Sequence, residues 1–145
     1  MRKVSEKVQL EAAEKLVSSL NKMDGVESSV DVRTNGTQNR PIVNASVSPE
    51  NWGKVAKQLK EKYLVDHCSM ITGIHWPESS DKKWEVIYHF LRTGIRDPVI
   101  EDGLVIPNIV DFSKVKGKDV PLEIQISIKI GDTRTPSVPS VQNLW

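Results

Sequence analysis

The stretch between residues 64 and 91 most constrains what this chain can fold into. Residues 64–76 and 83–91 read as two strands joined by a polar turn at residues 77–82. In the first strand Cys68, Met70, Ile74 and Trp76 share one parity; in the second Trp84, Val86, Tyr88 and Phe90 share one parity, with Ile87 and Leu91 on the other. A run that is apolar on both parities is expected of a central strand covered on both faces. We therefore expect this hairpin at the centre of a sheet.

Length, charge and cysteine content limit the class of protein. A chain of 145 residues can form one domain with its own core, which we place at residues 1–145. The 20 basic and 19 acidic residues lack the basic excess of a dedicated nucleic-acid binder. Cys68 is the only cysteine, which excludes an intramolecular disulfide and a four-thiolate metal site within this chain. No apolar run approaches the roughly 18 residues of a membrane span or forms the core of a signal peptide, so we expect a cytoplasmic protein.

Two helices are predicted. The first covers residues 5–23, where apolar residues recur at helical spacing at Val8, Ala12, Leu16, Leu20 and Met23, with Gly25 just past the end. The second begins at Ser48-Pro49-Glu50, which supplies an N-cap, a proline in the first turn and an acidic residue. The second helix also carries lysines at positions 54, 57, 60 and 62.

Alternating apolar residues predict the remaining strands. Residues 26–34 and 41–47 form a hairpin whose loop we expect to be longer than a two-residue turn. Residues 99–106 can form a small hairpin around Glu101-Asp102-Gly103, and residues 120–130 alternate most regularly of all. The order α-β-β-α-β-β-β predicts a two-layer α+β domain with both helices on one face of a mostly antiparallel or mixed sheet.

The residues that could carry chemistry do not converge. His67 and His75 would lie about 26 Å apart along an extended strand, and His89 belongs to the next strand, so we expect no metal site. Asp66 and His67 are adjacent in a strand and point to opposite faces. No phosphate-binding loop or nucleophile motif is present. We expect no catalytic residue and no cofactor.

Two surface features remain open to two explanations each. The lysines of the second helix fit either a solvated helix face or an acidic partner, and Glu61 dilutes their charge. The tail of residues 135–145 carries Val138, Val141, Leu144 and Trp145, large apolar groups that must be covered either by this domain or by another chain. These residues could pack back on the sheet or dock on a partner.

Residues 64–75, 84–90, 123–129 and 138–145 form four segments that, in this order, resemble a known family, that of the C-type subunits of complex I, the NADH:quinone oxidoreductase. Residues 64–75 are similar to its "L-x-D-x-T-A-V-D" strand, and residues 84–90 resemble its "F-E-V-V-Y-H-L" strand. Residues 123–129 stand where that family has its next strand. Residues 138–145 resemble its "V-P-S-V-T-x-x-W-P" segment. The resemblance covers residues 64–145, and more loosely the α-β-β-α segment before them.

The resemblance implies a non-catalytic subunit of the hydrophilic arm of complex I, or of a related membrane-bound [NiFe] hydrogenase of the Ech or CO-induced type. Such a subunit binds no cofactor, packs against the large subunit and neighbouring Fe–S subunits, and reaches the membrane only indirectly through the complex. Residues 131–145 would be an irregular docking segment. Its partner-binding residues would be Pro136, Ser137, Val138, Pro139, Ser140, Val141, Leu144 and Trp145.

The sequence departs from the family pattern in two places, and the first weakens the quinone-reductase assignment relative to the hydrogenase one. The acidic run Glu-Arg-Glu-x-x-Asp-x-x-Gly that should follow the tryptophan is not in the sequence, which stops at Trp145. Either the sequence was cut there, or this is one of the short hydrogenase-type versions that lack the run. The connection of residues 97–118 is longer than the usual one. Two rival classes stay open: a free-standing adaptor that binds through a sheet edge, and a small enzyme that uses His67, Asp66 or His89.

The docking hypothesis makes a testable prediction about the tail. If the tail is covered only by a partner, Trp145→Ala combined with Val138→Ala weakens partner binding and leaves the melting temperature of the isolated domain nearly unchanged. A large drop in melting temperature, followed by circular dichroism, would instead place these residues in the domain's own core.

Overall fold

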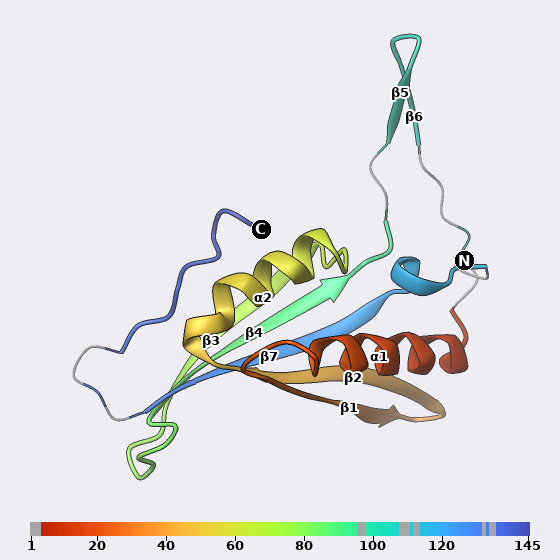
Figure 1. Cartoon of the computed structure of the whole chain (residues 1–145). Coiled ribbons are helices and arrows are strands. Elements are labelled where there is room, and N and C mark those ends of the chain that lie inside the picture. The colour runs from red at the N-terminus through yellow and green to blue at the C-terminus, as the bar shows by residue number, and fades with distance from the viewer. Residues whose placement is uncertain (1–3, 96–97, 108–110, 112–113, 132, 134–135) are drawn as a thin grey trace.

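The computed structural model describes residues 4–95, 98–107, 111, 114–131, 133 and 136–145. Its elements run α1 (Glu6–Leu20), β1 (Val26–Asn35), β2 (Gln38–Val47), α2 (Pro49–Glu61), β3 (His67–His75) and β4 (Trp84–Arg92), then β5 (Val99–Glu101), β6 (Leu104–Ile106), the 3₁₀ turn η1 (Gly117–Asp119) and β7 (Leu122–Ile130). Both helices cover one face of the main sheet (Figure 1). The predicted α+β class and order are confirmed.

The last strand occupies the centre of the main sheet. The strand order is β1-β2-β7-β4-β3, with β5 and β6 in a separate two-stranded sheet. β7 pairs in parallel with β2 and antiparallel with β4, and the other pairs are antiparallel. The predicted alternation of β7 is confirmed, because Leu122, Ile124, Ile126 and Ile128 are buried against the helices.

The prediction that the hairpin of residues 64–91 lies at the centre of the sheet is wrong. β3 is an edge strand, and most of its side chains are exposed. The register of β3 on β4 also shifts between Cys68 and Met70. As a result Cys68 and Ile71, opposite Phe90 and Tyr88, share the helix-covered face, and Met70 faces the other way. A bulge of this kind breaks the alternation from which the shared parity of Cys68 and Met70 was inferred.

Two further boundaries differ from the sequence prediction. β1 and β2 are joined by a two-residue turn at Gly36-Thr37, not by a longer loop, and Gly36 supplies the positive φ of 65° that the turn requires. Residues 64–66 precede β3 instead of belonging to it. Leu64 is left-handed with φ of 58°, and the Val65 N–H donates to the Leu59 carbonyl oxygen at 2.9 Å. The backbone of Val65 thus closes the end of α2, and its side chain is buried in the core.

Local signals begin the helices where they were predicted. The Ser5 hydroxyl caps α1 by accepting from the Val8 N–H at 3.2 Å, and Ser48 and Pro49 begin α2. Gly25 follows α1 with φ of +74°, and a Cβ there would collide with the side chains of Ser48 and Asn51. The chain between α1 and β1 thus packs directly on the start of α2.

An aromatic cluster joins α2 to β4. Trp52, with no exposed surface, packs its ring 4.9 Å from Tyr88 and 6.2 Å from Phe90, measured between centroids. Arg92, at the end of β4, is also buried and donates to the carbonyl oxygens of Val120, Tyr63 and Gly117. These contacts fix the end of β4 to the end of α2 and to the segment that leads into β7.

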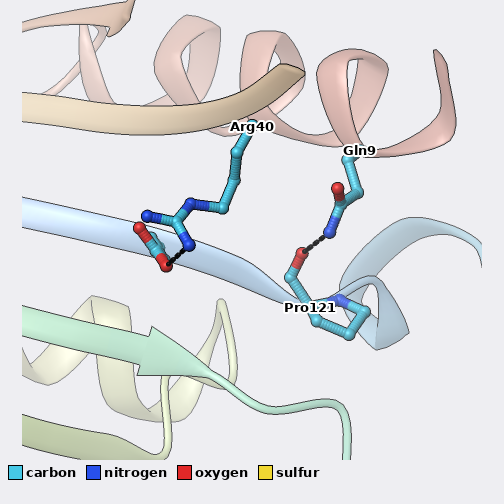
Figure 2. A network of polar contacts seen from close by, with 4 residues as sticks. Gln9, Arg40 and Pro121 are labelled. Atoms are coloured by element: carbon cyan, nitrogen blue, oxygen red, sulfur yellow. Dashed lines mark hydrogen bonds and ion pairs between the residues drawn. The ribbon is translucent and has the colours of Figure 1, made fainter. Parts of the chain in front are cut away.

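Polar contacts at the entry to β7 tie it to earlier elements, as Figure 2 shows. The side-chain amide of Gln9 on α1 donates to the Pro121 carbonyl oxygen at 3.3 Å, and Arg40 on β2 pairs with Glu123 at 3.3 Å. The Arg40 and Glu123 side chains are 57% and 34% exposed, so this ion pair contributes at most about 1 kcal/mol. Burial of the isoleucines, not this charge pair, holds β7 in place.

The central position of β7 predicts the cost of truncating its side chains. Ile126 is fully buried and lies opposite Ala45 and Tyr88, so Ile126→Ala should lower the free energy of unfolding by about 3 kcal/mol. Lys129→Ala, on the same strand but exposed, should change it by less than about 0.5 kcal/mol. Urea denaturation of both variants checks this expectation. Equal, small losses would contradict the placement of β7 in the core.

Candidate docking surface

The C-terminal segment packs on the same face of the sheet as the helices, over the part of β3 and β4 that α2 leaves uncovered. It runs back past α2 in Figure 1. Val141 is buried, and Val138, Leu144 and Trp145 are partly buried against the hydrophobic core. For these four side chains, the structure supports the explanation that they pack back on their own sheet. Thr135 lies outside the described residues.

Trp145 makes the most specific of these contacts. Its ring lies 4.6 Å from the Phe90 ring between centroids, and its indole N–H donates to the Val65 carbonyl oxygen at 3.0 Å. Trp145 thereby extends the aromatic cluster of Trp52, Tyr88 and Phe90 across the sheet. Because of these contacts, we expect that replacing Trp145 lowers the free energy of unfolding of the isolated domain.

The other predicted docking residues are exposed, and two of them, Pro139 and Ser140, also line a groove between the tail and β3. The full set is Pro136, Ser137, Pro139 and Ser140. The segment therefore has an inner side that contributes to the core and an outer side that presents prolines and serines. Proline restricts the unfolded chain, so little entropy is lost when such a segment binds a partner.

A groove of about 390 Å³ separates the tail from β3. Cys68 and Tyr88 form part of its floor, and Val138 and Trp145 part of its tail side. Burial raises the pKa of the Cys68 thiol, despite the opposing effect of a hydrogen bond with the Met70 backbone, and burial likewise raises the pKa of Tyr88. Both groups are therefore held in their neutral forms, and the groove suits an apolar contact better than nucleophilic chemistry.

The candidate catalytic residues have structural surroundings. Asp66 accepts from the Thr93 N–H at 2.8 Å and from the Thr93 hydroxyl. His75 stacks on Trp84 at 4.0 Å between ring centroids, and His89 lies opposite Met70. Asp66 and His67 line the groove, whereas His89 borders a separate hollow on the opposite sheet face. In the part of the chain that the structure describes, no three His, Cys, Asp or Glu side chains are placed to hold a metal ion.

The lysines of α2 remain at the surface. Lys54, Lys57 and Lys62 are exposed and Lys60 is partly buried. Lys62 extends over the Tyr63 ring, 5.5 Å from its centroid. This arrangement fits a solvated helix face, and Lys54 lines a shallow hollow together with Lys22 and Asp24.

A polar cluster on the open face of the sheet was not predicted from the sequence. Glu85 is 7% exposed, accepts from the Trp76 indole N–H at 3.1 Å and pairs with the Ser127 hydroxyl. Lys82 lies over the Trp76 ring, 4.7 Å from its centroid. The sequence signal that could have indicated this cluster is the acidic Glu85 between the apolar residues Trp84 and Val86. The cluster holds the turn end of the β3–β4 hairpin against β7.

Comparison with solved structures finds similar chains. One match is described as "Nqo5 of the trypsin-resistant fragment (1-134) in P63 form"; it is 14% identical, covers 94% of this chain and 81% of that chain, and has a TM-score of 0.49. No curated protein sequence matches this chain closely enough to count as a relative. The family assignment therefore rests on sequence.

The profile of the family described as "Respiratory-chain NADH dehydrogenase, 30 Kd subunit" matches residues 45–145. The chain belongs to this family, which confirms the resemblance found in residues 64–145. The match defines a subunit of the complex I type, from a family whose members sit in multi-subunit complexes. No helix among the described residues is long and apolar enough to cross a membrane.

The packing of Trp145 makes a prediction about stability. Trp145→Ala should lower the free energy of unfolding by about 2 kcal/mol, because it removes a partly buried ring from Phe90 and leaves the Val65 carbonyl without its donor. Trp145→Phe should lose less, because it keeps an aromatic ring there. Gln142→Ala, in the same segment but exposed, serves as the control. Identical denaturation curves for the wild type and all three variants would show that the tail is not part of the core.

Proposed function

We propose that this chain is a non-catalytic structural subunit of the hydrophilic arm of a membrane-bound complex, either a [NiFe] hydrogenase or a complex I-type NADH dehydrogenase. It forms one domain over residues 1–145 and packs on the large catalytic subunit and neighbouring Fe–S subunits. It is cytoplasmic and meets the membrane only through the complex. The observation that carries this proposal is the family match over residues 45–145.

The outer side of the tail is the proposed contact with the large subunit. Pro136, Ser137, Pro139 and Ser140 are exposed, while Val141 and Trp145 fix the segment from below. A segment already laid on the sheet loses little conformational entropy on binding. Val138, Val141, Leu144 and Trp145 then act chiefly by holding the segment on the sheet, and the exposed parts of Val138, Leu144 and Trp145 add to the contact surface.

A free-standing adaptor that binds through a sheet edge is the second candidate. One observation favours it: β1 is an edge strand with regular antiparallel pairing to β2 over ten residues. A regular, open edge can accept a strand from another protein. β3, at the other edge, is less suited to this, because its register shifts between Cys68 and Met70.

Affinity purification of the tagged chain from native membranes, followed by mass spectrometry, tests the proposal. The expected result is a stable complex that contains a hydrogenase-like large subunit with Fe–S and membrane subunits. The large subunit's nickel ligands, present or absent, separate hydrogenase from NADH dehydrogenase. Recovery of the chain alone as a soluble monomer would overturn the proposal, whereas recovery with an unrelated protein partner would favour the adaptor.

Substitutions on the outer side of the tail test the proposed contact. Ser137→Arg with Ser140→Arg should lower the amount of large subunit recovered by about tenfold, because two bulky charges replace small contacts. The melting temperature should change little, because both serines are exposed and the hydrogen bond from the Gln142 N–H to the Ser140 hydroxyl at 3.3 Å is itself exposed. Ser18→Arg with Ser29→Arg, two exposed serines on α1 and β1, is the matched control. Equal recovery with both variants would place the interface elsewhere.

A further inference from the structure

The β5–β6 hairpin stands away from the rest of the molecule (Figure 1). Its aliphatic side chains are among the most exposed in the described chain: Ile100 is 75% exposed, Leu104 68% and Val105 66%. Val99 and Ile106 are exposed as well. A two-stranded hairpin is marginally stable in water when nothing packs against it, and clustered exposed aliphatic residues mark an interaction surface.

The hairpin is apolar on both faces. Val99 lies opposite Ile106 and Glu101 opposite Leu104, so these pairs share one face, while Ile100 and Val105 lie opposite each other on the other face. An element that docks on a flat surface needs only one apolar face. An element with two apolar faces buries both only when it enters a cleft with two walls.

The backbone of the hairpin favours binding through side chains. Each strand has three residues, and Pro98 and Pro107 stand immediately outside them. Because proline has no backbone N–H to donate to a neighbouring strand, the edges of this short hairpin offer few backbone groups that could pair with an added strand. The strands are closed by Asp102 and Gly103 with φ of 50° and 76°, a tight turn that holds the faces in register.

The tip of the hairpin is acidic. Glu101 and Asp102 lie there, and residues 98–107 contain no basic residue. Two such tips would repel one another in a pairing of two copies of this chain. A lipid bilayer would also be a poor site, because the carboxylates at the tip would enter the hydrocarbon first. A basic surface at the end of an apolar cleft complements both features.

We propose that the β5–β6 hairpin is a docking arm that inserts into an apolar cleft on another protein subunit of the complex, with basic side chains of that subunit around the acidic tip. This inference rests on the proposed function, because it requires that the chain work within a complex. It adds a second contact, separate from the outer side of the tail, and it identifies the kind of surface that receives it.

Site-specific photo-crosslinking in the purified complex tests the arm directly. A photo-reactive amino acid replaces Ile100 in one protein and Leu104 in another, one on each face, and Lys54 on α2 in a control. Both hairpin positions should crosslink to the same other protein subunit. The crosslinked peptides of that subunit should line one cleft, and Lys or Arg residues should lie near the end of the cleft. Crosslinks to a second copy of this chain, to lipid, or to no subunit would each overturn the proposal.

Substitutions separate this inference from the proposed function. Ile100→Ser with Val105→Ser should raise about tenfold the protein concentration at which the complex half-dissociates in native gels, because two aliphatic anchors are lost. Glu101→Gln with Asp102→Asn keeps the turn chemistry and should weaken the salt dependence of that concentration. Met70→Ser with Leu10→Ser, two exposed apolar residues elsewhere, is the control.

The possible outcomes are distinct. If the wild-type chain enters the complex and the hairpin variants bind as tightly as the control, the docking arm is wrong and the proposed function stands. If the wild-type chain is found only as a free monomer, both are wrong. Weaker binding by the hairpin variants alone supports the arm.

Discussion

The burial of β7 between β2 and β4 is the constraint on which the rest of this structure depends. Residues 122–130 arrive last among the strands, yet they supply the centre of the core through Ile124, Ile126 and Ile128. Without β7, the β1–β2 hairpin with α1 and the β3–β4 hairpin with α2 have no common sheet. Because these contacts are distant in sequence, the sheet is completed only after the whole chain is available.

The contact between β7 and its neighbours also decides where the functional surfaces lie. β4 is held against β7, so β3 becomes an edge and the area beyond α2 is left for the C-terminal segment. Trp145 fills that area by packing on Phe90 and donating to Val65. The long connection between β4 and β7 carries the β5–β6 hairpin outward. The C-terminal segment is thus bound to the core and exposes prolines and serines, whereas the β5–β6 hairpin exposes aliphatic side chains away from the core.

Local sequence signals predicted the elements well. The regular alternation of residues 120–130, the Ser48-Pro49 helix start and the small hairpin around Asp102-Gly103 all depend on neighbours within a few residues. The order of strands could not be predicted in this way, because the parallel pairing of β2 with β7 depends on residues about eighty positions apart. The register shift near Ser69 and the left-handed Leu64 likewise depend on tertiary contacts that periodicity does not contain.

The candidate site was predicted only in part. The tail was recognised from its apolar residues and family resemblance, but periodicity could not tell that Val141 and Trp145 pack on the core while Ser137 and Ser140 stay exposed. The division follows from the space that α2 leaves uncovered above β4. Arg92 was missed although it continues the buried parity of Tyr88 and Phe90, because its role depends on three carbonyl oxygens from distant segments.

Amide hydrogen exchange of the isolated chain tests most directly whether β7 organises the fold. The amides of Leu122–Ile130 should exchange slowest, together with their partners on β2 and β4, and only through global unfolding. The amides of Val99–Ile106 should exchange close to the rate of an unstructured peptide. Exchange of β7 that is as fast as that of the β5–β6 hairpin, while β1 and β2 stay protected, would contradict the central role of β7.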